Sequence, residues 1–288
     1  NILPITIYAT QFEIHDLFKF GKLILSFLYH RIIVDVFLYW WDRSKTAGWG
    51  FDSLRDRQKK MKTNLTKLNQ SIIKCKQCPR LVQFIKKIAT EKRKQYLNET
   101  YWAKPITGHG DPKAQILFVG LAPAAHGGTR TGRVFTGDAS STFLFQCLYK
   151  AKLCNQPTSV ARTDGLKLYH SYITTALKCV PPQDKPTITE LNNCSSYFQK
   201  EISYLTNLKM IIALGKIAFD ACIKFYKNKY DLSQQKFKFV HGKQYILPDG
   251  KILLGCYHPS PRNVNTGRIN LIKMTKVFIA AKQTLKIN

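Results

Sequence analysis

Four short apolar segments, each followed by a stretch with helical periodicity, limit the fold of this chain more than any other feature. Short apolar runs without polar alternation are typical of strands that are buried on both faces. Strands of this kind that alternate with helices form a parallel sheet covered by helices on both sides. The sequence therefore predicts an α/β fold, with strands at residues 115–120, 172–177, 210–214 and 251–257.

The segments between and around these strands carry the spacing of amphipathic helices. Thr187 and Glu190 form a capping box, which predicts a helix that begins there and runs to about residue 205. A ribbon around residues 237–247 is expected to lead into the last strand. The other helices are predicted at residues 65–95 with an interruption at 75–79, 140–152, 216–226 and 268–285.

The chain of 288 residues carries 45 Lys and Arg against 17 Asp and Glu, a formal net charge of +28. Its hydrophobic content of 44% is enough for a packed core, which excludes a disordered basic tail. A positive excess of this size favours a polyanion as partner. Nucleic acid is the first candidate because phosphate contacts need many Lys and Arg side chains. An anionic membrane surface and a merely lysine-rich surface are the alternatives.

Residues 1–60 differ from the rest, because their nine basic and six acidic residues leave a net charge of only +3. A membrane span is not expected, since charged residues interrupt the apolar stretch 17–41. We interpret residues 1–60 as an N-terminal extension that lies outside the natural start at Met61. A small added domain and a membrane-surface helix are the alternatives. A chain that begins at Met61 is therefore expected to fold and to be active.

Two of the eight cysteines, Cys75 and Cys78, are spaced so that both thiolates can bind one metal. Cys179, just after the second predicted strand, and Cys194, in the capped helix, are candidates to complete a four-thiolate site. Such a set accepts zinc or an iron–sulfur cluster, and the number of thiolates does not distinguish them. A redox dithiol and a disulfide framework are the alternatives. The remaining cysteines are expected to be buried and inert or to have packing roles: Cys147, Cys154, Cys222 and Cys256.

The loop after the first strand is rich in glycine and reads GLAPAAHGGTRTGRVFTGD. It matches neither a P-loop nor a dinucleotide fingerprint. Gly120 permits close backbone approach to a ligand, and Phe135 offers an aromatic ring. Asp138 adds a carboxylate, while Arg130 and Arg133 add cations. This combination suits a planar neutral ligand next to a phosphate backbone, and the alternative is a solvated loop held by Arg–Asp pairs.

The loop after the fourth strand carries His258 in a polar, proline-bounded segment. A His at the carboxyl end of a parallel strand faces the crevice in which such folds bind ligands. Ser260, Arg262 and Arg268 follow it and are able to reach phosphates. A third loop, which contains Asp184, follows the second strand. We therefore expect three loops to converge at one edge of the sheet, with the metal-binding cysteines beside them.

The glycine-rich loop and the segment HPSPRN-x-x-TGR together resemble the type-5 branch of the uracil-DNA glycosylases, over about residues 61–288. The set of Cys75, Cys78, Cys179 and Cys194 is similar to the four-iron–four-sulfur ligands of the type-4 and type-5 enzymes. The resemblance implies a three-layer α/β/α sandwich around a four-stranded parallel sheet. It also implies a 4Fe-4S cluster as a structural cofactor.

The resemblance further implies a DNA repair enzyme that hydrolyses the N-glycosidic bond of uracil and leaves an abasic site. It implies a broad range of bases, including deaminated and oxidised ones such as hypoxanthine. We expect a monomer that acts on double-stranded or single-stranded DNA in the cytoplasm of a prokaryotic-type cell, at the nucleoid. The alternatives are a catalytically inactive DNA-binding module that keeps the fold, a zinc-bound nucleic-acid protein and a redox carrier.

Each motif residue acquires a role from the resemblance. Phe135 is expected to stack on the flipped-out base, and His258 to stabilise charge on the uracil oxygen. Asp138 is the expected water-activating group, and Asn263 is expected to orient either His258 or the substrate. The predicted substrate contacts are Gly120, Leu121, Ala122, Ala124, Phe135 and Asp184, and the predicted DNA contacts are Arg130, Arg133, Ser260, Arg262 and Arg268.

Four positions depart from the pattern of the wider family. Leu121 and Ala122 stand where other branches hold Asp, Asn or Glu, and neither can accept a proton. Asp184 stands where Asn is usual, and Thr129 replaces a more usual Asn, so fine substrate preference is open. The lysine-rich helix before the first strand is expected to hold duplex DNA through Lys86, Lys87, Lys92, Arg93 and Lys94.

Overall fold

The computed structural model describes residues 54–233 and 236–287. The chain divides into two compact units, residues 1–56 and 57–288, and nearly all described residues belong to the second. The apolar stretch 17–41 and most of the predicted extension lie outside the described residues. Helix α2 (Leu54–Ile73) runs through the predicted boundary, and Met61 is buried within it. The second unit therefore starts at residue 57 rather than at the predicted residue 61.

The second unit is built around a six-stranded sheet in the order β1-β3-β2-β4-β6-β5. Its four central strands are parallel and match the four predicted apolar segments. The edge strands β1 (His109–Gly110) and β5 (Gln244–Ile246) pair antiparallel and make the sheet two strands wider than predicted. β1 is too short to give an apolar run, while β5 lies inside the predicted ribbon. The central strands are β2 (Ile116–Gly120), β3 (Ser171–Thr175), β4 (Met210–Leu214) and β6 (Ile252–Cys256).

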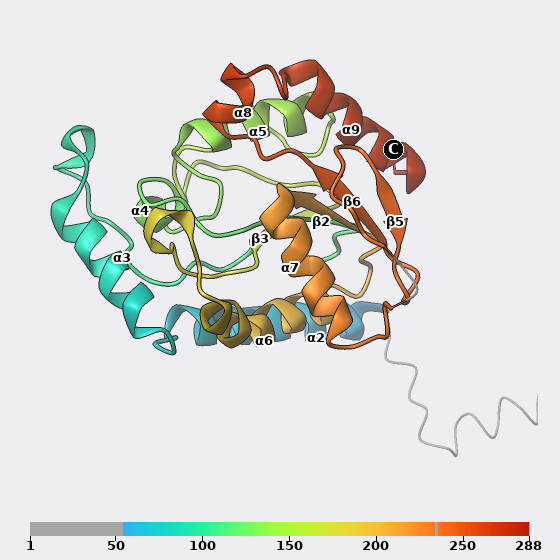
Figure 1. The fold of residues 1–288 in the computed structure, drawn as a ribbon, viewed down its shortest axis with the longest axis horizontal. Helices are drawn as coiled ribbons and strands as arrows, with labels where there is room; N and C mark the ends of the chain where they lie inside the picture. The colour runs from blue at the N-terminus through green and yellow to red at the C-terminus, as the bar shows by residue number, and fades with distance from the viewer. Residues whose placement is uncertain (1–53, 234–235, 288) are drawn as a thin grey trace, which may run out of the picture. The chain divides into compact units, whose positions relative to one another are not determined.

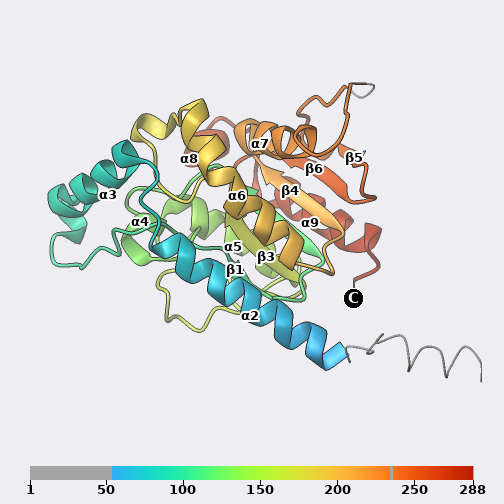
Figure 2. The same ribbon diagram turned by 90° about the horizontal axis from the view of Figure 1, so that it is seen from below.

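Helices cover both faces of the sheet, which confirms the predicted α/β/α layers (Figures 1 and 2). Successive strand residues point to opposite faces. Phe118 therefore packs with α5 and α9 on one face, and Val119 packs with α2, α6 and α7 on the other. Because β2, β3 and β4 are buried along their whole length, their sequences show no alternation. The helices not yet given are α3 (Pro79–Glu91), α5 (Ala139–Lys150), α6 (Ile188–Tyr204), α7 (Lys216–Lys227) and α9 (Leu271–Thr284).

The helix ends follow local signals in the sequence. The predicted capping box of Thr187 and Glu190 forms at the start of α6. Two short helices, α4 (Gly128–Thr131) and α8 (Pro261–Asn265), were not predicted, because a single turn shows no apolar periodicity. Among the described residues, no helix has the length and apolar character needed to span a bilayer.

The four parallel strands end at the same edge of the sheet, as their register shows. Gly120 at the end of β2 lies beside Thr175 of β3, and Leu214 of β4 lies beside Cys256 of β6. The loops that follow these strands therefore leave from one edge, where open α/β sheets bind their ligands.

Candidate functional site

The loops after β2 and β6 meet through the side chains of Phe135 and His258. Their ring centroids lie 5.9 Å apart, with an interplanar angle of 37°. Gly120 lies behind Phe135, because a Cβ atom at Gly120 would come within 3.0 Å of the phenyl ring. The lack of a side chain at Gly120 thus lets the ring rest on the end of β2. The structure brings together three residues that were predicted on two separate loops.

His258 is held in place by the short helix α8 that follows it. The side-chain amide of Asn263 donates a hydrogen bond from Nδ2 to the backbone carbonyl of His258, at 2.9 Å. Ser260 caps α8, and its hydroxyl accepts from the backbone N–H of Asn263 at 3.4 Å. Asn263 therefore makes an orienting contact with His258. Burial lowers the pKa of His258 to about 4, so its imidazole is neutral near pH 7.

A fourth loop, between β4 and α7, also reaches His258 and was not predicted from the sequence. A Cβ atom at Gly215 would lie 3.3 Å from the Cβ atom of His258. The φ angle of Gly215 is +101°, a conformation that favours glycine. Helix α7 begins at the next residue, so its amino end lies near His258. One signal was available, since Gly215 directly follows a buried apolar segment, and the other predicted site glycine, Gly120, ends one.

Asp138 caps helix α5 from the end of the glycine-rich loop. Its Oδ1 atom accepts a hydrogen bond from the Ser141 N–H at 2.8 Å. Its other oxygen lies against Gly127, where a Cβ atom would be only 2.0 Å from Oδ2. Burial raises the pKa of Asp138, and this outweighs the hydrogen bonds at the helix start and the charge of Arg130. A partly desolvated carboxylate of this kind is suited to accept a proton.

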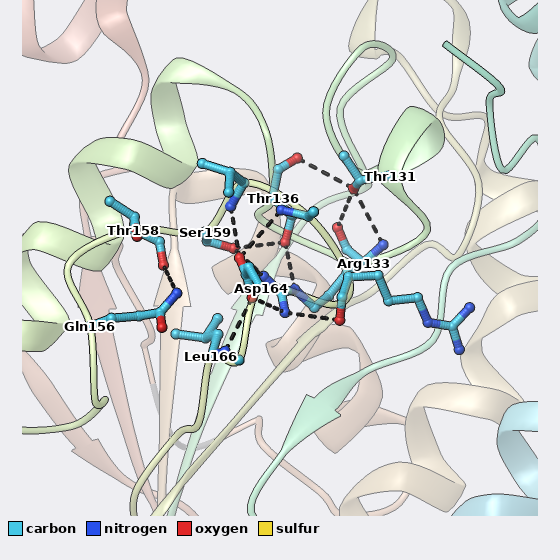
Figure 3. Close-up of polar contacts among 12 residues, drawn as sticks. Thr131, Arg133, Thr136, Gln156, Thr158, Ser159, Asp164 and Leu166 are labelled. Atoms are coloured by element: carbon cyan, nitrogen blue, oxygen red, sulfur yellow. Dashed lines mark hydrogen bonds and ion pairs between the residues drawn. The ribbon is translucent and has the colours of Figure 1, made fainter.

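Arg133 is buried and has its partners inside the protein (Figure 3). Its guanidinium binds both carboxylate oxygens of Asp164, at 2.9 and 2.7 Å. It also donates to Thr136 Oγ1 at 2.9 Å and to Ser159 Oγ at 3.0 Å, and Ser159 in turn donates to the Phe135 carbonyl. Burial alone would raise the pKa of Asp164, but hydrogen bonds from Arg133 and from backbone N–H groups lower it to about 2. Arg133 therefore stabilises the loop on which Phe135 lies.

Arg130 is also buried and forms an ion pair with Glu99. Both arginines were predicted to bind DNA, and in the structure their guanidinium groups pair with carboxylates of the protein. Neither forms the alternative pair with Asp138 among the ion pairs of the described residues. The partners were not predictable from local sequence, since Glu99 and Asp164 each lie 31 residues from their arginine.

Some of the backbone groups predicted to contact the substrate after β2 form hydrogen bonds within the protein. The carbonyl oxygens of Gly120 and Leu121 each accept a hydrogen bond from the segment after β3, at 2.9 Å. The carbonyl of Ala124 accepts from the N–H of Thr129 at 3.0 Å. Ala122 is half-buried, and Ala124 is exposed. The loop is thus fixed by its own backbone hydrogen bonds.

The other predicted contacts lie on the surface. Arg262 and Arg268 are exposed on the segment after His258, so a phosphate backbone can reach them. Asp184 is exposed and has a left-handed φ angle of +57°. Its described hydrogen bond runs from its backbone N–H to the carbonyl of Pro181, at 3.2 Å. Asp184 thus lies on the loop after β3, as expected. Among the described residues, it makes no hydrogen bond or ion pair with the glycine-rich loop.

The four predicted metal ligands line one small cavity of about 20 Å³. Cys75 and Cys78 come from the turn between α2 and α3, Cys179 follows β3, and Cys194 lies in α6. Burial raises the pKa of Cys194 to about 11, with smaller contributions from the thiols of Cys75 and Cys78. The cavity is otherwise lined mainly by apolar side chains, among them Leu81, Val82, Leu177 and Tyr197.

Hydrogen bonds reach two of the four thiols. Within the part of the chain that is described, no three His, Cys, Asp or Glu side chains are placed to hold a metal ion. The backbone N–H of Lys178 donates to Cys194 Sγ at 3.2 Å, and Asn193 Nδ2 donates to Cys78 Sγ at 3.6 Å. Four thiols around one mainly apolar cavity form a donor set that suits zinc or an iron–sulfur cluster.

A buried ion pair directly before Cys179 was not predicted from the sequence. Lys178 Nζ lies 2.5 Å from Glu201 Oε2, and both side chains are at most 1% exposed. Thr174 donates to the same carboxylate oxygen at 2.8 Å. The pair joins the end of β3 to α6, the element that carries Cys194. Charges at this depth are tolerated only when they are paired and hydrogen-bonded.

Two comparisons with known proteins bear on this site. Residues 107–286, well over half of the chain, match the model of a family described as the uracil DNA glycosylase superfamily. The matched range contains the loops after β2, β3, β4 and β6 and therefore every crevice residue described above. Cys75 and Cys78 lie before it.

Individual relatives extend the similarity toward the amino terminus. The chain is 42% identical over 214 residues to a protein named type-5 uracil-DNA glycosylase from Thermus thermophilus, which covers 74% of this chain and 95% of the relative. A protein of the same name from Pyrobaculum aerophilum is 41% identical over 207 residues, 72% of this chain and 87% of the relative. A type-4 uracil-DNA glycosylase from Sulfurisphaera tokodaii is 28% identical over 206 residues, 68% and 74%.

Proposed function

This chain belongs to the uracil-DNA glycosylase superfamily, and we propose that it removes uracil from DNA by hydrolysing the N-glycosidic bond. The resemblance to the type-5 branch that two motifs indicated is confirmed by the relatives of that name. The observation that carries the proposal is the contact of Phe135 with His258 at the carboxyl edge of the sheet. Asp138 lies at the end of the same loop as Phe135. The product is an abasic site in an uncut strand.

The target base must leave the DNA stack before it can enter the crevice, which costs a few kcal/mol. Phe135 offers a ring on which the flipped base stacks, and such stacking contributes about 1–3 kcal/mol per base. Gly120 brings the backbone close to this ring without a side chain in the way. The crevice therefore suits a flat, uncharged base such as uracil.

Breaking the bond leaves negative charge on the base, and His258 is placed to stabilise it. Its pKa of about 4 keeps the imidazole neutral near pH 7, so that it donates a hydrogen bond from N–H rather than a full charge. The amino end of α7, beside His258, adds a positive electrostatic potential. Asn263 holds the backbone of His258 in position. Replacing His258 by Asn is expected to lower kcat about 10²- to 10³-fold.

Asp138 is the group that we assign to the water and to the positively charged sugar. It is the one carboxylate in the glycine-rich loop, whose Leu121 and Ala122 cannot accept a proton. Its raised pKa reflects partial desolvation, which strengthens its interaction with a developing cation. The reaction therefore needs Asp138 in its ionised form, and activity falls as the pH drops through its pKa.

We assign a 4Fe-4S cluster to the cavity formed by Cys75, Cys78, Cys179 and Cys194. The four thiols, their shared cavity and the N–H groups directed at Cys194 and Cys78 support this assignment. When bound, the cluster supplies structural support, because it links the turn between α2 and α3 to the end of β3 and to α6.

DNA binding is assigned to exposed cations rather than to the buried arginines. Arg262 and Arg268 follow His258, and Ser260 lies between them and the crevice. The exposed basic side chains of α3 and the segment after it add to this surface. We expect double-stranded and single-stranded DNA with uracil as substrates, hypoxanthine among the accepted bases, and action as a monomer on the nucleoid in the cytoplasm.

The proposal is tested with a duplex oligonucleotide that contains one uracil opposite guanine. The protein is expected to release free uracil and to leave a strand that breaks only after treatment with alkali. Strand cleavage without alkali would contradict hydrolysis as the sole reaction. Tight binding without any base release would instead identify an inactive DNA-binding module.

A further inference from the structure

Arg130 lies at the centre of the glycine-rich loop and contacts both of its ends. Its Nε atom donates to the carbonyl of His126 at 2.8 Å, and its Nη2 atom donates to the carbonyl of Gly137 at 2.8 Å. One rigid guanidinium group therefore bridges two backbone positions that are eleven residues apart in sequence. Gly137 directly precedes Asp138, so its carbonyl is part of the peptide unit that carries the Asp138 N–H.

The bridge is held from outside by residues 96–103. The Nη1 atom of Arg130 pairs with the carboxylate of Glu99, and its guanidinium carbon lies 3.9 Å from the centre of the Tyr96 ring. The backbone of the same segment also binds the loop, since the Trp102 N–H donates to the carbonyl of Arg130 at 2.9 Å. Each guanidinium nitrogen thus has a partner in the protein, and the side chain is only 9% exposed.

Arg130 packs tightly against Gly137. A Cβ atom at Gly137 would lie 2.5 Å from Nη2 of Arg130, and Gly137 has a left-handed φ angle of +76°. The position of Gly137, and with it the direction in which the chain enters Asp138, therefore depends on the guanidinium group.

We propose that Arg130 is a positioning residue for catalysis: by bridging the carbonyls of His126 and Gly137 it fixes the Asp138 carboxylate at the start of α5. This inference rests on the proposed function, in which Asp138 acts on the water and the sugar. Arg130 acts through Gly137 and touches neither DNA nor base. A misplacement of about 1 Å can lower the rate of an enzyme about 10²-fold, so a displaced Asp138 should reduce kcat without weakening DNA binding.

The charge of Arg130 gives a second, independent test, because it affects the pKa of Asp138. Arg130 is the charged side chain that lowers the pKa of Asp138, and the backbone N–H groups of Ser140 and Ser141 donate to its carboxylate from the start of α5. His258, after β6, is neutral near pH 7. Arg130 lowers the pKa of Asp138, so its removal should raise that pKa. Because Asp138 must be ionised to act, the acid limb of the pH profile of kcat should move to higher pH.

Two variants of the full-length protein separate geometry from charge. Arg130→Lys keeps the charge but cannot bridge two carbonyls with a planar fork, so kcat should fall with the acid limb unchanged. Arg130→Gln removes both, so kcat should fall further, to about 10²-fold below the wild type, with the acid limb at higher pH. KM and the Kd for DNA should stay within about twofold of the wild-type values. In a further variant, Arg130→Ala, guanidinium chloride should partly restore kcat, whereas potassium chloride should not.

A variant outside the loop covers the case in which the Arg130 variants do not fold. Glu99→Gln removes the half-exposed partner of Arg130 outside the loop and should lower kcat in the same direction by a smaller factor. Lys227→Gln is the control, because it removes an exposed cation at the end of α7, outside the crevice and the DNA-binding surface, and should leave both kcat and DNA binding unchanged.

Several results would overturn the inference. An unchanged kcat in Arg130→Gln, or equal losses in both Arg130 variants with neither a pH shift nor guanidinium rescue, would leave Arg130 a purely structural role. A weaker Kd with a smaller salt dependence would make it a phosphate contact. A wild-type protein that releases no uracil would refute the proposed function itself, whereas an active wild type with unaffected variants refutes only this inference.

Discussion

Phe135 has a backbone φ angle of +49°, in the left-handed region that residues with large side chains seldom adopt. Such strain costs about 1–3 kcal/mol and persists where the surroundings impose it. Ser159 binds the Phe135 carbonyl at 3.0 Å, while Gly120 and His258 lie against the ring. The strained backbone therefore places the ring that we assign to base stacking.

The contact between Gly120 and Phe135 leads to a prediction for Gly120→Ala. The φ angle of Gly120 is not positive, so alanine fits the backbone, but its Cβ atom would lie 3.0 Å from the phenyl ring and displace it. Loss of stacking worth about 1–3 kcal/mol corresponds to about a 10- to 100-fold lower rate of uracil release. The midpoint of thermal unfolding should stay close to that of the wild type. An unchanged single-turnover rate would contradict the role of the ring.

Single residues were predictable where a motif carried them and not where a distant partner decides their role. Phe135, Asp138 and His258 were predicted from their motifs, and the structure places the rings of Phe135 and His258 in contact. Arg130 and Arg133 were assigned to DNA because the sequence shows an arginine but not its partner. Their carboxylates belong to other segments of the chain, and only the folded structure brings them within hydrogen-bonding distance.

At the scale of helices and strands, the sequence predicted the elements whose own residues show a clear apolar pattern. The four parallel strands were predicted because each is an apolar run buried by both helix layers. The edge strand β1 and the short helices α4 and α8 were not, since each is shorter than two periods of the pattern that it would have to repeat. The site loop at Gly215 was missed for a related reason, because it is only a tight turn between β4 and α7.

The buried pair of Lys178 and Glu201 joins two elements, and its removal tests their coupling. Glu201→Gln leaves an unpaired buried charge and should lower the free energy of unfolding by about 3–5 kcal/mol. The double variant Lys178→Met with Glu201→Leu should lose much less, since no charge stays buried. Urea unfolding measures both, and Asp220→Asn, which breaks an exposed pair with Lys216, should change stability by no more than about 1 kcal/mol. A double variant as unstable as Glu201→Gln would contradict this account.

The cysteine cavity gives a prediction about metal content. Cys179→Ala should purify with much less iron and sulfide than the wild type, because one of four ligands is missing. Cys154→Ala is the matched control, since Cys154 is a buried free thiol outside that cavity and should leave the iron content unchanged. Zinc in place of iron in the wild-type protein, or equal iron in both variants, would refute the cluster assignment.

For the molecule as a whole, the net charge of +28 acts through exposed side chains. Arg130 and Arg133 neutralise carboxylates inside the protein, so they contribute little to the field that DNA meets. Binding should therefore depend on many separate surface cations and weaken steeply as the salt concentration rises. Composition alone predicted a polyanionic partner, but not which of the cations face it.

The salt dependence of binding can be assigned to individual residues. Arg262→Gln should weaken binding to DNA of any sequence and lower the slope of log K against log salt by about 1. Lys227→Gln is the control, because Lys227 ends α7 at the far side from the amino end that approaches His258. A slope that is unaffected by Arg262→Gln would remove this residue from the DNA-binding surface.

The central claim of the proposal is that Asp138, at the end of the loop that carries Phe135, makes the chain an enzyme rather than a DNA-binding protein. The most direct test compares single-turnover release of free uracil by the wild type, Asp138→Asn and the exposed control Asp231→Asn. Asn keeps the cap of α5, so folding and DNA affinity should be preserved. We predict that Asp138→Asn releases uracil about 10²- to 10⁴-fold more slowly, with Asp231→Asn at the wild-type rate. Equal rates in all three proteins would contradict the claim.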